Sequence, residues 1–108
     1  MKLDRDAVIA ETKVTHYLLR WQPSGDKSRF LASAGYSLLD ASLLIHDIRQ
    51  LLTQESVFEG SMEYGDTYRI HGQLTGPNGR TLRVVSAWMV EYSSGLTKFL
   101  TLFPDREA

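Results

Sequence analysis

Apolar residues recur at helical spacing in the first half of this 108-residue chain and at strand spacing in the second half. Between Ser37 and Gln54 they follow the i, i+3, i+4, i+7 pattern of one helix face: Ala41, Leu44, Ile45, Ile48, Leu51 and Leu52. Ser37 stands where an N-cap residue is expected. From Tyr68 to Leu74, polar and apolar residues alternate, which is typical of a strand with one buried face. The change from helical spacing to alternation of apolar residues predicts an α+β fold.

Two shorter helices are predicted ahead of the long one. Residues 11–20 carry apolar residues at helical spacing: Val14, Tyr17 and Leu18. A break follows at Pro23, because proline disfavours helix at the residue before it. A second helix is expected to start near Ser24 or Asp26, over residues 26–34, and to end at Gly35, where a left-handed cap residue is expected.

Turn-forming residues divide the second half into strands. Residues 75–79 are dense in turn formers, residues 80–92 are rich in Val, Trp, Met and Tyr, and Gly95 precedes a last apolar run that ends at Pro104. We therefore predict two to three N-terminal helices packed on a C-terminal antiparallel sheet of three to four strands. One domain would span residues 1–108, with a helical part over about residues 8–54 and a sheet over about residues 62–104.

Composition excludes several classes of protein. The formal net charge is -1 and 23% of residues are charged, which is unlike a strongly basic nucleic-acid binder or an acidic disordered segment. No cysteine is present, so disulfides, thiolate nucleophiles and sulfur-ligated metals are excluded. The sequence lacks the apolar run of a signal peptide and any stretch that could span a membrane. We expect a cytoplasmic protein that makes no contact with a membrane.

Metal and cofactor sites are not predicted. The three histidines, His16, His46 and His71, are far apart, and none has a partner at the spacing of a metal-ligand pair. No P-loop, dinucleotide glycine fingerprint, HExxH or GxSxG motif is present.

The alternating strand offers one face on which chemistry is conceivable. Arg69, His71 and Gln73 fall on one side of it, and Arg83 and Lys98 from neighbouring strands would add cations. Metal-independent ribonucleases need a base for the ribose 2′-hydroxyl, an acid for the leaving 5′ oxygen and a cation for the phosphorane. The alternative is that these residues form the solvated face of an amphipathic sheet, which polar alternation also explains.

Four further residues have two interpretations each. Tyr64 and Trp88 could stack on bases, or they could be core residues. Arg80 closes a Gly-Pro-Asn-Gly segment that could face a phosphate, although a hairpin turn explains the segment fully. Lys27 could meet an anion at the start of the second helix, or it could simply be exposed.

A series of short motifs runs through the chain in order: Lys13 with Tyr17-Leu-Leu19, Lys27 three residues before Phe30, Gly35, Tyr64-Gly65, Gly76-Pro-Asn-Gly-Arg80, Trp88, and Thr101-x-x-Pro104. In this order they resemble an uncharacterised bacterial family of small domains, itself similar to C-terminal domains of polymorphic toxins. Such toxin domains are often grouped with the barnase, EndoU, colicin and RelE-like ribonucleases. The resemblance implies helices ahead of an antiparallel sheet that carries the active site.

The resemblance extends to residue roles. Its polar positions are Lys13, Lys27, Tyr64, Arg80 and Thr101. In a ribonuclease, Lys27 and Arg80 would contact phosphate, and Thr101 would orient the scissile group. Lys13, or His71 from the sheet face, which is not part of the pattern, would act as acid or base, and Tyr64 would stack or donate a proton. Residues that would bind the substrate are Tyr64, Arg69, Arg83 and Trp88.

Two functions follow as hypotheses. The first is a toxin-like domain of a bacterial toxin–antitoxin or conflict system, acting as a metal-independent endoribonuclease without a cofactor. Its partners would be an RNA substrate and an antitoxin or immunity protein. The second is a non-catalytic interaction module that binds a partner protein or forms a homodimer, which the near-neutral charge favours.

Overall fold

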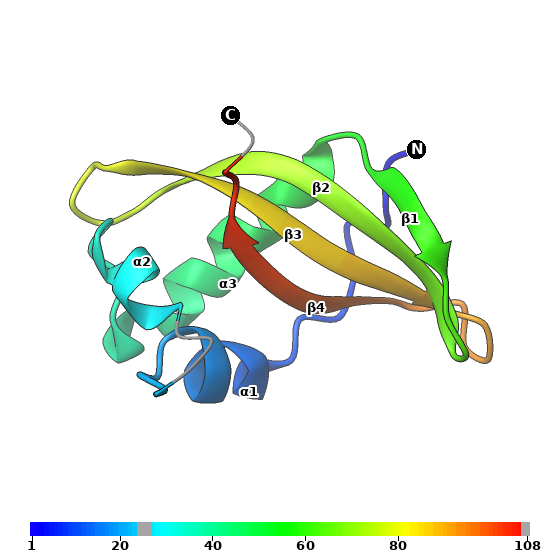
Figure 1. Cartoon of the computed structure of the whole chain (residues 1–108), viewed down its shortest axis with the longest axis horizontal. Coiled ribbons are helices and arrows are strands. Elements are labelled where there is room, and N and C mark those ends of the chain that lie inside the picture. Colours follow the sequence, from blue (N-terminus) through cyan, green and yellow to red (C-terminus); the bar gives the residue numbers. More distant parts are fainter. Residues whose placement is uncertain (24–26, 107–108) are drawn as a thin grey trace.

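The computed structural model of this chain describes residues 1–23 and 27–106. Helical elements come first, and they are α1 (Glu11–Lys13), the π-helical turn η1 (Val14–Leu18), α2 (Ser28–Ala32), the 3-10 turn η2 (Leu38–Asp40), α3 (Ala41–Gln50) and the 3-10 turn η3 (Leu51–Thr53). The strands are β1 (Val57–Ser61), β2 (Gly65–Thr75), β3 (Thr81–Glu91) and β4 (Thr97–Pro104). They form one antiparallel sheet in the order β1-β2-β3-β4 (Figure 1). The predicted α+β fold is confirmed.

The long helix begins where its cap predicts. The hydroxyl of Ser37 accepts a hydrogen bond from Leu39 N, and the carboxylate of Asp40 accepts one from Ser37 N at 2.9 Å, which is a capping box. Before it, Gly35 has a φ of 92° and ends α2, as expected of a left-handed cap. The predicted start of α2 near Ser24 or Asp26 lies outside the described residues.

The first helix differs from its prediction in one turn. After α1 the chain widens into η1, in which Leu19 N donates to Val14 O across five residues. Val14 and Leu18 are buried as expected, but Tyr17 is 65% exposed. The wider turn rotates Tyr17 away from the core, so its assignment to the apolar face was wrong.

The sheet starts earlier than predicted, at Val57 rather than about residue 62. All of β1 except Gly60 is exposed, so its sequence has no buried alternation that could have revealed it. Its pairing with β2 also carries an irregularity at Glu59, between Phe58 and Gly60.

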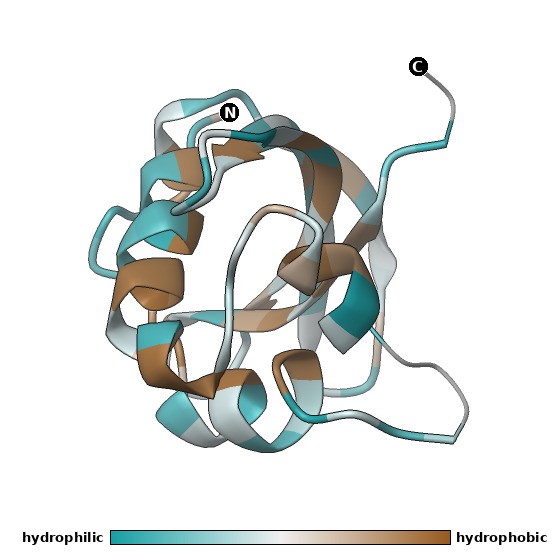
Figure 2. Cartoon of the chain, turned by 90° about the vertical axis from the view of Figure 1, so that its left-hand side faces the viewer, coloured by the Kyte–Doolittle hydropathy of each residue, from teal (hydrophilic) through white to brown (hydrophobic). Residues whose placement is uncertain are grey.

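The core lies between the helices and one face of the sheet. Fully buried side chains come from both layers, including Leu31, Leu44, Ile48, Ile70 and Trp88. Figure 2 shows apolar segments in the helices as well as in the strands. In the described part of the chain, no helix is both long and apolar enough to cross a membrane.

The turn between β2 and β3 packs against the end of α2 (Figure 1). Asn78 N donates to Ala34 O at 3.2 Å, and Asn78 Nδ2 donates to Ser33 O at 3.1 Å. A Cβ on Gly76 would lie 2.0 Å from Ala34 O, so only glycine allows this approach. The segment therefore has a structural role as a hairpin turn, which is the simpler of its two interpretations.

Candidate functional site

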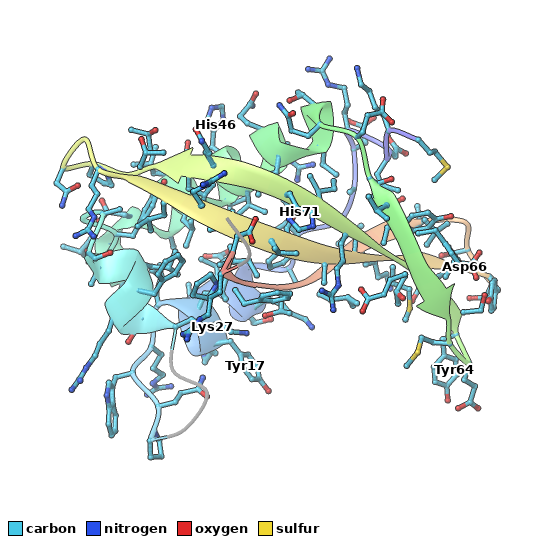
Figure 3. The ribbon with its side chains drawn as sticks, turned by 45° about the horizontal axis from the view of Figure 1, so that its top comes forward. Tyr17, Lys27, His46, Tyr64, Asp66 and His71 are labelled. Atoms are coloured by element: carbon cyan, nitrogen blue, oxygen red, sulfur yellow. The ribbon has the colours of Figure 1, made fainter. Side chains whose placement is uncertain are left out.

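A pocket of about 440 Å³ lies at the outer edge of β4, beside η1 and the start of α2. Its lining residues come from both ends of the chain: Lys13, Tyr17, Leu18, Gln22, Lys27, Leu100 and Thr101. Figure 3 shows Tyr17 and Lys27 near each other on this side of the molecule. Lys13, Lys27 and Thr101 are three of the five residues to which the sequence assigned catalytic roles.

A β-bulge forms the floor of the pocket. Ala87 pairs with Thr101 and Trp88 pairs with Phe99, so Leu100 is an extra residue in β4. Its carbonyl oxygen accepts a hydrogen bond from Lys13 Nζ at 3.2 Å. The carbonyl group of the bulge residue therefore holds the Lys13 ammonium group at the outer edge of β4.

The second lysine of the pocket bonds to the neighbouring residue of the bulge. Lys27 Nζ donates to Thr101 Oγ1 at 2.8 Å. Burial lowers the pKa of Lys27, because desolvation disfavours its charged form. This contact joins residues 74 positions apart in the sequence.

The pocket is suited to anions. It contains two ammonium groups, and none of its described lining residues is acidic. Tyr17 and Gln22 add a phenol and an amide beside them. Phosphate is the common biological anion that lysine binds as a point charge, and partial burial strengthens that attraction.

The open face of the sheet continues from this pocket. Arg69, Ala87 and Thr101 are in register across three strands, and His71, Val85 and Phe103 form the next row on the same face. In an ideal sheet these spacings put the Cα atoms of Thr101 and His71 about 12 Å apart.

His71 and Arg69 have partners on this face. His71 Nδ1 lies 3.0 Å from Asp105 Oδ2, and the His71 side chain is 49% exposed. Arg69 makes two hydrogen bonds to Glu59, at 2.6 and 2.8 Å, and its guanidinium lies over the ring of Phe103. A second pocket of about 360 Å³ is lined by these two residues, Phe103 and Asp105, among others.

The remaining candidates lie elsewhere. Arg80 is exposed at the β2–β3 turn and does not line the pocket. Tyr64 is 70% exposed at the end of the β1–β2 hairpin, far from Lys27 (Figure 3). Arg83 is exposed on the open face, opposite Gln73, and Lys98 forms an ion pair with Glu91.

Trp88 requires a correction. It is fully buried, its ring packs edge-on against Phe99, and its Nε1 donates to Ser86 Oγ at 2.8 Å. A residue without exposed surface cannot stack on a base, so Trp88 is a core residue and not a substrate-binding one.

Sequence reasoning missed Tyr17, Gln22 and Leu100 as pocket residues, and Asp105 as the partner of His71. Tyr17 stands four residues after Lys13, a spacing that places two side chains together on a helix, so this one signal was available. The described residues contain no group of three or more His, Asp or Glu side chains placed to hold a metal ion.

Helices ahead of a four-stranded antiparallel meander, with a lysine-lined pocket at the last strand, define a small α+β domain with a pocket at its sheet edge. The chain belongs to DUF6883, a family described as a domain of unknown function, whose model matches residues 2–106. No curated protein matches it.

The chain is also similar to one in a solved structure described as a contact-dependent growth inhibition toxin–immunity protein complex from Klebsiella pneumoniae 342. The TM-score is 0.72 with 15% identity, over 92% of this chain and 100% of the other. At this identity the likeness shows a shared fold.

Proposed function

We propose that this chain is a toxin-like domain of a bacterial conflict system that cleaves RNA without a metal ion. The contact between Lys27 and Thr101, beside Lys13, is the observation that carries the proposal. The fold it shares with a chain of a toxin–immunity protein complex supports the conflict-system role. The family resemblance of the motifs supports the ribonuclease role.

The pocket supplies the electrostatic part of such a reaction. The ribose 2′ oxygen attacks the adjacent phosphorus, the bond from phosphorus to the 5′ oxygen breaks, and negative charge gathers on the phosphoryl oxygens. Lys27 and Lys13 would stabilise that charge, and Thr101 would fix the position of the Lys27 ammonium group. The products are a 2′,3′-cyclic phosphate and a 5′-hydroxyl.

Proton transfer requires two further groups. His71 is the candidate base, because a ring that donates through Nδ1 to Asp105 leaves Nε2 able to take the proton of the 2′-hydroxyl. The exposed phenol of Tyr17, in the pocket itself, is the candidate acid for the 5′ oxygen. The open face between Thr101 and His71 would then carry the RNA strand.

Reaction with RNA in the presence of a chelator tests this proposal. We expect the purified chain to cleave a labelled single-stranded RNA in EDTA and to leave 2′,3′-cyclic phosphate ends. DNA of the same sequence should stay intact, because it has no 2′-hydroxyl. A requirement for added metal, equal cleavage of the DNA, or intact RNA at high protein concentration would contradict the proposal.

The lowered pKa of Lys27 predicts how binding depends on pH. A lysine is charged below its pKa and neutral above it, so a lowered pKa moves the loss of charge to lower pH. We expect affinity for a 2′-O-methyl RNA, which cannot be cleaved, to weaken as the pH rises through the lowered pKa of Lys27. Fluorescence anisotropy between pH 7 and 10.5 measures this. Lys27→Arg should bind across the range, since arginine stays charged; the same pH profile in both proteins would count against the assignment.

A protein-binding role is the second candidate. Several large apolar side chains are exposed along β1 and at the adjacent β1–β2 and β3–β4 turns: Val57, Phe58, Met62, Tyr64, Tyr92 and Leu96. Such a surface is unusual unless it meets a partner. Binding through it would be less sensitive to salt than RNA binding, which releases counterions.

A further inference from the structure

Strand β2 is longer than the strand beside it. β1 pairs with β2 from Asp66 to Arg69, where the register ends at the Val57–Arg69 pair. β2 continues to Thr75, and β3 pairs with it over that whole length. Beyond Arg69, therefore, one edge of β2 has no neighbouring strand in the described part of the chain.

The direction of the backbone groups on this edge follows from the ladder. Gly76 N donates to Arg80 O across the hairpin, so Gly76 faces β3. In an antiparallel pair the direction alternates from residue to residue, so Thr75, Gln73 and His71 turn their N–H and C=O groups away from β3. Two hydrogen bonds support this direction. Thr75 O accepts from Tyr36 Oη at 3.3 Å, on the side away from β3. Gly65, which has the same direction as Thr75 in the alternation, accepts from Met62 N through its carbonyl oxygen.

The backbone groups of His71 and Gln73 have no partner on that side in the described chain. The segment that leads into β1 turns elsewhere, because Ser56 N donates to Met1 O and Gln54 N donates to Leu51 O. The N–H and C=O groups of His71 and those of Gln73, about 7 Å apart along the strand, are therefore available for hydrogen bonds.

A groove of about 500 Å³ runs beside this edge, between β2 and η3. Its lining residues are Gln50, Leu51, Thr53, Gln54, Gly72 and Gln73. None of them carries a formal charge. The glutamine amides both donate and accept hydrogen bonds, as a peptide backbone does.

We propose that an extended segment of a partner protein adds to the sheet as a strand at His71 and Gln73, in the place that β1 leaves empty. The spacing and direction of the open groups match those of a strand backbone. Because the groove has no cation, it does not favour a nucleic-acid strand. The outer edge of β1 is a poorer template, since the irregularity at Glu59 interrupts its ladder.

This inference does not rest on the proposed ribonuclease activity, because it uses the backbone groups of His71 and not the ring that is the candidate base. A library of random heptapeptides displayed on phage, selected against the immobilised full chain, supplies the probe. The best recovered peptide is synthesised, and its affinity is measured by fluorescence anisotropy. Amide hydrogen exchange with and without the peptide then reports on individual β2 residues.

Gln73→Pro is the diagnostic variant, with Gln73→Ala as its matched control. Proline removes the N–H that points away from β3 and leaves the β2–β3 ladder intact, whereas alanine removes only the side chain. We expect at least a tenfold loss of affinity in Gln73→Pro and less than a threefold loss in Gln73→Ala. In the wild type, bound peptide should slow exchange at the His71 and Gln73 amides.

Three outcomes would overturn the proposal. They are recovery of no binding peptide, a bound peptide that leaves the His71 and Gln73 amides exchanging as before, and a Gln73→Pro variant that binds as tightly as the wild type. The exchange measurement uses the wild-type chain, so it decides the question even where Gln73→Pro folds poorly, which circular dichroism would reveal.

Discussion

Lys27→Ala is expected to lower the rate of RNA cleavage by about 100- to 1000-fold. The substitution removes the ammonium group that bonds to Thr101 Oγ1 and leaves Lys13 as the one lysine among the described lining residues of the pocket. Single-turnover cleavage of a labelled RNA measures the effect on the purified chain. In a bacterial host, induced wild type should arrest growth and fragment RNA, whereas Lys27→Ala should do neither.

Arg80→Ala is the matched control, since it also removes one positive charge. Arg80 is exposed at the β2–β3 turn and lies outside the pocket, so its loss should change cleavage less than threefold. Equal losses in the two variants would show that net charge matters and not the pocket. A Lys27→Ala protein that cleaves like the wild type would remove Lys27 from the mechanism.

Trp88→Ala is expected to destabilise the fold by about 3 to 5 kcal/mol. The indole is fully buried, packs on Phe99 at 5.2 Å between ring centroids, and bonds to Ser86 through Nε1, so its loss leaves a cavity and removes one of the two hydrogen bonds of the Ser86 hydroxyl. Urea unfolding followed by circular dichroism measures the free energy of unfolding.

Tyr64→Ala serves as the control for that measurement. Its side chain is 70% exposed, so the free energy of unfolding should change by about 0.5 kcal/mol or less. Unfolding midpoints that shift equally in the two variants would contradict the assignment of Trp88 to the core.

Local signals in the sequence were enough to predict much of the fold. Ser37 caps the helix that its position predicted, Gly35 takes the left-handed conformation, and the residues of β2 alternate between core and solvent as their order suggested. These features depend on neighbours within a few positions, and such neighbours are visible in a sequence.

The site depended on contacts that a single sequence does not encode locally. No residue signals the bulge at Leu100, which needs the register of β3 against β4 to be known. Tyr17 turned outward because η1 widened, and Asp105 met His71 only through the path of β4. Lys13, Lys27 and Thr101 were named from the order of motifs, while their meeting in one pocket required the fold.

The distance in sequence between Lys27 and Thr101 affects when the pocket can form during synthesis. A ribosome adds about 5 to 20 residues each second, so the 74 positions between them take roughly 4 to 15 s to make. Throughout that interval Lys13 and Lys27 have been synthesised, but the strand that completes their pocket has not. A nascent chain that lacks β4 therefore has no assembled pocket, and the Lys27–Thr101 contact forms only once β4 joins the sheet.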